Sequence, residues 1–210
     1  MLGHQERWIV LTPRHSQRGV SLIEVAIGLV VTAILLATAL PNFSAWLQNS
    51  KIRTTAEAIL NGLQMARAEA VRRNTLVRFQ LTDAISASCA VNTTGTSWVI
   101  SLDDPTGACN TAASDTVAPR IIQTRSGEEG SSNVVVAAGQ SPITFNGTGR
   151  QPTSPAPANI TIAVTNPTGG ACATATATSG MRCLNVVVST GGQVRMCDPA
   201  VVVTTDPRAC

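Results

Sequence analysis

A single carboxylate, Glu24, lies four residues inside an apolar segment that runs from Val20 to Leu40. Inside a bilayer such a group costs about 2.5 to 3.5 kcal/mol on insertion scales, so it is normally kept for a cationic partner. Gly19 ends the polar segment before it. If the chain were cut between Gly19 and Val20, the new terminal ammonium would lie at the same depth as the Glu24 of a neighbouring copy. A cut at this point would therefore supply the cation that a Glu24 at membrane depth needs.

The apolar segment is long enough to span a bilayer core as a helix. Arginines precede it at positions 7, 14 and 18, and basic residues stay on the cytoplasmic side. The rest of the chain is therefore expected in the periplasm. Two other interpretations are open. Ala37-Thr38-Ala39 fits the cleavage site of a secretory signal peptide, although the apolar region is longer than the usual length of roughly 7 to 15 residues. A plain single-pass anchor would have no use for an acid at position 24.

Catalysis, cofactors and bound metals are not expected. Both histidines, His4 and His15, precede the cleavage point, so the processed chain lacks the usual general base and the commonest metal ligand. The paired acids at 103–104 and 128–129 lie in Gly/Pro/Ser-rich sequence, which is typical of solvated loops. Residues 1–19 hold three arginines and one glutamate, so the processed chain keeps 12 basic and 11 acidic residues. That balance does not indicate a globally basic nucleic-acid-binding protein.

All six cysteines follow the apolar segment, and an even number of cysteines in an oxidising compartment indicates disulfides. Six cysteines allow 15 pairings, and their order along the chain favours sequential loops. No Cys-x-x-Cys pair or remaining histidine supports zinc or redox chemistry, which is the weaker alternative. The expected disulfides are Cys89–Cys109, Cys172–Cys183 and Cys197–Cys210.

Apolar residues continue beyond Pro41 with the spacing of an amphipathic helix, at positions 56, 59, 60, 63, 66 and 70. One helix is expected from about Val20 to Arg73, with a kink near Pro41 and a stop at Asn74. The expected parts of the chain are a leader (1–19), a membrane-spanning half of the helix (20–41), an amphipathic periplasmic half (42–74) and a β domain (75–210).

Alternating apolar residues in the last part of the chain predict antiparallel strands. Thr190-Gly191-Gly192 has the composition of a hairpin turn, and segments 146–159 and 165–182 are expected to be loops. The expected fold is α+β, with the long N-terminal helix packed on antiparallel sheet. The expected strands are 76–81, 98–102, 120–124, 133–137, 142–145, 160–164, 184–189 and 193–197.

Gly19-Val20-Ser21-Leu22-Ile23-Glu24 resembles the prepilin signature of type IV pilins and type II secretion pseudopilins, with Val20 where most pilins have Phe. The resemblance implies that a prepilin peptidase cuts after Gly19 and methylates the new amine, and that Glu24 serves subunit docking. Three further segments resemble the FimT/GspH family and its "ARSEAIRRN", "TFNxxGR" and "GRxRxCDP" motifs. They are residues 64–74, residues 143–150 and residues 192–199.

This resemblance implies a minor type IV pilin that is incorporated into the pilus or primes it. Such a subunit has a single helix in the inner membrane and its soluble part in the periplasm, or outside the cell once in the pilus. Its partners are other pilin subunits. The alternative is a type II secretion pseudopilin, which primes a short filament and binds no DNA.

Some minor pilins of the family resemble DNA receptors of natural transformation, which use arginines of the C-terminal motif. Arg195 occupies one of these positions, whereas Gln193 replaces the other arginine. Arg182, Arg208 and Arg150 complete the candidate set. Arginine neutralises phosphate without reading sequence, so the resemblance implies weak, salt-sensitive contact with double-stranded DNA of any sequence.

Overall fold

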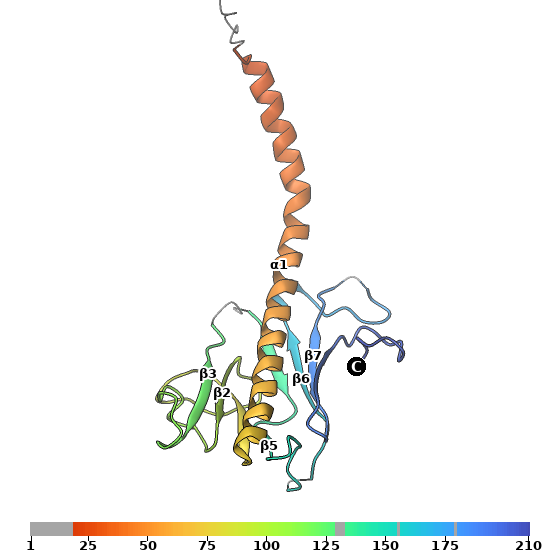
Figure 1. The fold of residues 1–210 in the computed structure, drawn as a ribbon. Helices are drawn as coiled ribbons and strands as arrows, with labels where there is room; N and C mark the ends of the chain where they lie inside the picture. The colour runs from red at the N-terminus through yellow and green to blue at the C-terminus, as the bar shows by residue number, and fades with distance from the viewer. Residues whose placement is uncertain (1–18, 129–132, 155, 179) are drawn as a thin grey trace, which may run out of the picture. The chain divides into compact units, whose positions relative to one another are not determined.

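The computed structural model describes residues 19–128, 133–154, 156–178 and 180–210, without the side chains of residues 38–42. The expected leader thus lies outside the described residues, except for Gly19, and so does the side chain of Pro41, where the kink is expected. The chain divides into two compact units, Met1–Pro41 and Asn42–Cys210. Figure 1 shows the helix and the strands of the described residues.

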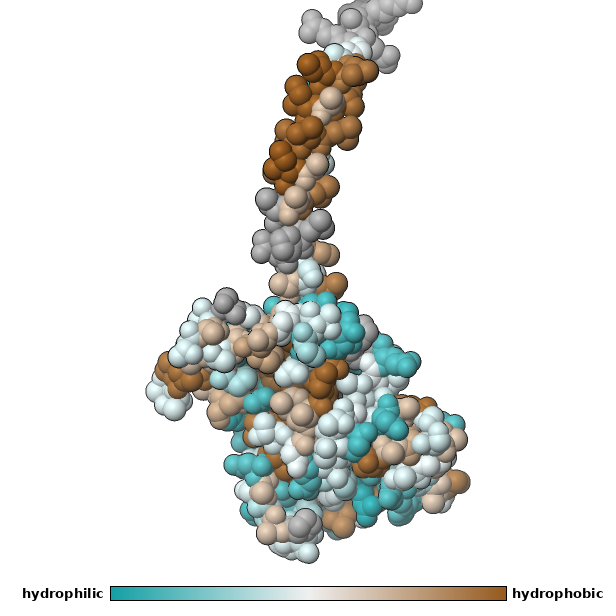
Figure 2. Space-filling model, turned by 180° about the vertical axis from the view of Figure 1, so that it is seen from behind, coloured by the Kyte–Doolittle hydropathy of each residue, from teal (hydrophilic) through white to brown (hydrophobic). Residues whose placement is uncertain are grey.

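Helix α1 (Leu22–Arg73) begins directly after Ser21. The Ser21 Oγ accepts a hydrogen bond from the Glu24 backbone N–H (3.2 Å), which makes Ser21 the N-cap. In the first unit the large apolar side chains are exposed, from Leu22 (88%) to Leu36 (55%), and Figure 2 shows this apolar surface. Within the described ranges, no helix has both the length and the apolarity needed to cross a membrane.

In the second unit the helix buries one face, formed by Ile52, Ala56, Ile59, Leu63, Ala66 and Ala70. This is the predicted stripe, except that Leu60 is only half-buried and Ile52 extends the stripe by one turn. The helix ends at the predicted stop. Asn74 has a φ of 50°, the Thr75 N–H donates to the Ala70 carbonyl (3.2 Å), and the Asn74 N–H donates to the Val71 carbonyl (3.3 Å). These bonds form a Schellman cap with Asn74 in the left-handed position.

The strands form two antiparallel four-stranded sheets, with the orders β3-β2-β1-β5 and β4-β6-β7-β8. In Figure 1, β2 and β3 lie on one side of α1, and β6 and β7 lie on the other. The predicted α+β fold is confirmed, and each predicted strand is found within two residues of its expected ends. The strands are β1 (Val77–Thr82), β2 (Ser97–Ser101), β3 (Ile121–Arg125), β4 (Val135–Ala138), β5 (Ile143–Phe145), β6 (Ile160–Thr165), β7 (Leu184–Val188) and β8 (Val194–Cys197).

The buried face of α1 packs with residues of both sheets in one core. At Gly62 the helix backbone lies close to the first sheet. A Cβ there would lie 2.8 Å from Phe79 Cε2 and 3.1 Å from Trp98 Cζ2, and these two rings are 5.5 Å apart. Glycine at this position therefore lets the helix backbone approach the aromatic pair.

The first sheet is buried on its second face as well, which the alternating sequence pattern does not reveal. Gln80 and Ser101 are 2% and 0% exposed, and the Gln80 Nε2 donates to the Ser101 Oγ (3.1 Å). The loop closed by the Cys89–Cys109 disulfide packs there with Val99 and Ile121 in a second, small cluster. The loop thus supplies the cover that makes this face part of the interior.

The remaining disulfides, Cys172–Cys183 and Cys197–Cys210, complete the sequential pairing expected from the sequence. The segment 165–182, expected to lack regular structure, contains the short 3-10 helix η1 (Pro167–Gly169). The Cys197–Cys210 disulfide folds the last residues back beside the end of β8, where Asp198 bridges to Ala209.

Three segments that are distant in sequence meet at the Gly149 carbonyl. Arg67 of α1 donates its Nε–H to that oxygen (2.9 Å). Gly192, in the turn between β7 and β8, packs so closely on it that a Cβ would overlap the oxygen. Gly149 and Gly192 have φ values of 73° and 79°, which favour glycine. We call this contact, made by Arg67, Gly149 and Gly192, the Gly149 corner. It joins the segments that carry the three internal motifs.

Candidate functional site

The predicted processing point lies before the first turn of α1. Gly19 and Val20 are exposed and outside regular structure, so the peptide bond between them is accessible. Glu24, in the first turn, is exposed as well, and its carboxylate has no ion-pair partner among the described residues. An acid in the first turn of a helix also interacts favourably with the helix dipole. Glu24 thus supports the helix start while its carboxylate is free to receive a cation.

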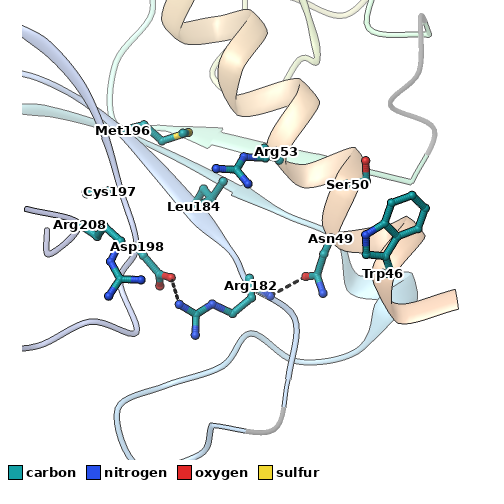
Figure 3. A pocket seen from close by; sticks show the side chains of 10 residues that line it. All are labelled: Trp46, Asn49, Ser50, Arg53, Arg182, Leu184, Met196, Cys197, Asp198 and Arg208. Atoms are coloured by element: carbon teal, nitrogen blue, oxygen red, sulfur yellow. Dashed lines mark hydrogen bonds and ion pairs between the residues drawn. The ribbon is translucent and has the colours of Figure 1, made fainter. Parts of the chain in front are cut away.

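The second unit contains a groove of about 480 Å³ between α1 and the end of the second sheet. We call it the arginine groove, because Arg53, Arg182 and Arg208 line it together (Figure 3). Leu184 and Met196 contribute apolar surface. The full lining is Trp46, Asn49, Ser50, Arg53, Arg182, Leu184, Met196, Cys197, Asp198 and Arg208.

Arg182 is the best-anchored arginine of the groove. Its backbone N–H donates to the Asn49 Oδ1 of α1 (2.7 Å), and its guanidinium donates to Asp198 Oδ2 (2.5 Å). The Asp198 side chain is only 9% exposed, and its Oδ1 accepts the Ala200 N–H (2.9 Å). Arg182 therefore balances a buried carboxylate, so a phosphate could recruit this guanidinium only in competition with Asp198.

Arg208 and Arg195 are engaged as well. The Arg208 guanidinium donates to both carboxylate oxygens of Asp206, at 2.7 and 3.1 Å, and this hydrogen bonding lowers the pKa of Asp206 from 3.8 to about 2. Arg195, on β8, donates to the carbonyl of Ala209 (2.8 Å) and to the main-chain oxygen of Cys210 (3.0 Å), the last residue of the sequence. Its guanidinium thus holds the last residues in place and has no side-chain carboxylate as a partner among the described residues.

The fourth predicted arginine, Arg150, is exposed and follows the Gly149 corner. Its guanidinium has no hydrogen-bond or ion-pair partner among the described residues. The structure thus brings Arg182 and Arg208 together in the groove, whereas Arg195 and Arg150 do not line it. DNA contact by these four arginines stays a prediction.

Sequence reasoning missed the contribution of α1 to the groove. Arg53 belongs to the polar face of the predicted helix, and Trp46 is 63% exposed beside Phe43, with ring centroids 5.8 Å apart. Two aromatic residues, Phe43 and Trp46, outside the buried stripe of the helix were the sequence signal that could have indicated this wall of the groove. The wall of the groove opposite α1 includes loop residues after residue 165, and the sequence pattern does not predict where these loops lie.

The paired acids have structural partners. Arg120 donates to both oxygens of Asp103, at 2.6 and 2.7 Å, and this interaction lowers the pKa of Asp103. Asp104 accepts hydrogen bonds from the Thr106 hydroxyl (2.7 Å) and backbone N–H (3.0 Å). Glu128 is exposed, and Glu129 lies outside the described residues. Among the described residues no group of His, Cys, Asp and Glu could hold a metal ion.

A signature segment at the start of a long helix, followed by a disulfide-tied unit of two antiparallel sheets, defines a pilin-like subunit. The family described as type II transport protein GspH matches residues 55–192, and the prokaryotic N-terminal methylation motif matches residues 14–40. The chain therefore belongs to the GspH family of pilin-like structural subunits, which includes type IV minor pilins and type II secretion pseudopilins.

Solved structures of the type IV minor pilin FimU of Pseudomonas aeruginosa (strain PAO1) show similarity as well. One crystal form is 16% identical over 72% of this chain and 91% of that chain, with a TM-score of 0.45. A second crystal form is 17% identical over 69% and 90% of the two chains, with a TM-score of 0.43. No curated protein gave a significant match.

Proposed function

We propose that the chain is a minor type IV pilin of the FimT type, which is incorporated into the pilus or primes its assembly. The proposal rests on the difference between the two halves of α1. Its half in the second unit buries a continuous apolar face, whereas the apolar side chains of its first half, from Leu22 to Leu36, are exposed. A helix that is apolar on its whole surface needs surroundings of lipid or other helices. A pilin subunit meets both, first in the inner membrane and then in the filament.

In this proposal residues 20–41 anchor the precursor in the inner membrane and residues 42–210 lie in the periplasm. A prepilin peptidase hydrolyses the Gly19–Val20 bond, releases residues 1–19 and methylates the Val20 amine. The resulting ammonium of one subunit then pairs with Glu24 of a neighbouring pilin. The exposed cleavage point and the unpaired Glu24 carboxylate support this sequence of steps.

Mass spectrometry of the chain recovered from membranes tests the processing step. We expect an N-terminal residue corresponding to methylated Val20, and an uncut precursor for Gly19→Asp. A chain that starts at Leu40 would instead identify a secretory signal peptide and refute the anchored pilin. Glu24→Ala should be processed normally yet be lost from sheared pili, and its normal recovery there would refute the docking role.

A second candidate function, contact with double-stranded DNA, rests on the charges that remain available. Arg150 and Arg195 are exposed without a side-chain carboxylate as a partner among the described residues, whereas Arg182 and Arg208 are paired with aspartates. Two phosphate contacts correspond to a salt slope of about −2 in log K against log salt. Binding is therefore expected to be weak and to fade at physiological salt.

Gln193→Arg is the decisive variant for DNA contact. Gln193 and Arg195 are exposed two residues apart at β8, so their side chains lie on the same face. An added arginine should strengthen binding and steepen the slope by about one unit. Gln123→Arg, on the exposed surface of β3, adds the same charge to the other sheet and is the matched control. Equal effects of the two variants, or no binding at low salt, would refute a DNA site on this face.

The type II secretion pseudopilin remains the alternative within the same family. Deletion of the gene separates the two functions, because loss of pili with normal protein secretion identifies the pilin and the opposite result identifies the pseudopilin.

A further inference from the structure

The arginine groove combines an apolar surface with basic side chains. Leu184 and Met196 give it an apolar part, and the guanidinium groups of Arg53, Arg182 and Arg208 surround it (Figure 3). A ligand that matches both must carry an anionic group next to an apolar one. A phospholipid has this chemistry, because its phosphate adjoins the acyl chains.

The ion pairs in the groove leave room for such an anion. Arg53 and Glu57 are 70% and 51% exposed at their side chains, and Arg208 and Asp206 are 69% and 23% exposed. The Arg53–Glu57 pair is exposed on both sides, and such pairs contribute about 0 to 1 kcal/mol, so a phosphate can compete for the Arg53 guanidinium. The Arg208 side chain is itself largely exposed, so it can contact the same anion while it stays bonded to Asp206. Arg182 stays with the nearly buried Asp198, and its charge is balanced by that carboxylate.

The aromatic end of the groove indicates where the phospholipid comes from. Trp46 lines the groove and stacks with Phe43, and both rings are exposed by 60% or more. Trp side chains are enriched at the level of lipid headgroups. Chain connectivity keeps Trp46, six residues after Leu40, within about 20 Å of that residue even if the intervening chain were fully extended.

We propose that the arginine groove binds the headgroup of an anionic phospholipid in the periplasmic leaflet of the inner membrane. This inference rests on the proposed membrane anchor, residues 20–41, and adds a second contact between subunit and bilayer. The groove holds the phosphate between Arg53 and Arg208, and Trp46 lies at the headgroup level. The subunit must break this contact when it leaves the membrane for a filament.

Photocrosslinking of the processed chain, residues 20–210, in nanodiscs tests the inference. The nanodiscs contain phosphatidylcholine with a phosphatidylglycerol probe that carries a diazirine in its headgroup, and labelled peptides are mapped by mass spectrometry. We expect label at the ends of the anchor and in peptides from residues 46–53 and 182–210. At a constant fraction of probe, replacement of phosphatidylcholine by unlabelled phosphatidylglycerol should reduce the groove label relative to the anchor label.

Arg53→Gln and Arg208→Gln should each reduce the groove label about fivefold, the factor that corresponds to about 1 kcal/mol for one basic residue near an anionic surface. Arg125→Gln removes a charge from β3, in the other sheet, and should leave the label unchanged. The anchor peptides serve as the internal standard for every variant.

The outcomes separate this inference from the function it rests on. Label confined to residues 20–41 would overturn the groove site and leave the anchor intact, whereas absence of label from both would overturn the anchor as well. Equal label from a phosphatidylcholine probe would refute the anionic headgroup. Displacement of the groove label by duplex DNA, but not by phosphatidylglycerol, would assign the groove to nucleic acid.

Discussion

Substitution of Gly192 by alanine should destabilise the second unit far more than the same change at its neighbour Gly191. Gly192 has a φ of 79° and its absent Cβ would overlap the Gly149 carbonyl oxygen, with the Arg150 Cα 3.1 Å away. Both obstacles are backbone atoms, which cannot turn aside as a side chain would. Gly191 has neither problem, because its nearest neighbour would be the Ser189 Oγ at 3.8 Å.

The expected cost has two parts. A left-handed conformation costs a non-glycine residue about 1 to 2 kcal/mol, and the steric overlap adds about 1 to 3 kcal/mol. The free energy of unfolding should therefore fall by about 2 to 5 kcal/mol for Gly192→Ala, which corresponds to a decrease of about 4 to 20 °C in Tm for a chain of this size. Gly191→Ala should stay within about 0.5 kcal/mol of the wild type.

Thermal unfolding of the two variants with intact disulfides, followed by circular dichroism under one set of conditions, measures the difference. The Gly149 carbonyl also accepts the Arg67 bond, so Gly192→Ala should displace the turn that precedes Gln193. Equal Tm values for the two variants would refute the Gly149 corner as a close backbone contact.

Two further predictions concern the stability of the same unit. Joint replacement of Cys172 and Cys183 by alanine should lower the free energy of unfolding by about 3 kcal/mol, the entropic effect of a loop with a sequence separation of 11; an unchanged midpoint in denaturant would contradict it. Hydrogen bonds from Arg72 and Arg73 lower the pKa of Glu69 from its usual 4.5. Because the folded-state pKa is the lower one, this contribution to stability is present above about pH 4.5 and is lost as the pH falls through the lowered pKa. Stability measured against pH should therefore fall less steeply below pH 4.5 for Glu69→Gln, and parallel curves for variant and wild type would count against the Glu69 pairs.

The helix and the individual strands could be predicted because each leaves a local pattern. The buried stripe of α1 repeats every three or four residues, and Val77, Phe79 and Leu81 alternate with less apolar residues in β1. The end of the helix was also local, since Asn74 tolerates the left-handed conformation of the cap. The matches to the GspH family and to the N-terminal methylation motif agree with the resemblance found in the sequence.

The division into two sheets could not be predicted in this way. Strand β5 pairs with β1 rather than with its sequence neighbour β4, which pairs with β6. Such choices depend on contacts between segments that are far apart in sequence. The buried polar residues Gln80 and Ser101 have the same origin, because only the Cys89–Cys109 loop removes their side of the sheet from water.

The candidate arginines show a further limit of the sequence. They were expected to contact DNA, but Asp206, two residues before Arg208, pairs with it locally, and the pairing of β7 with β8 brings Asp198 beside Arg182. Arg53 could not be joined to them, since it comes from a helix more than 100 residues earlier. The sequence shows which residues are charged, whereas the fold determines which of these charges are paired with an opposite charge.

The position of the cysteines has a mechanical consequence. All six follow residue 88, so none of the three disulfides joins α1 to the sheets. Apart from the peptide chain that continues from α1 into β1, the helix is therefore held against the sheets by non-covalent contacts, namely its apolar packing and hydrogen bonds such as Gln48 with Asn166 (2.6 Å) and Arg67 with Gly149. Under tension the helix is expected to shear out of the unit while the cross-linked loops of the sheets stay intact, so the yield force of the subunit is set at the helix surface.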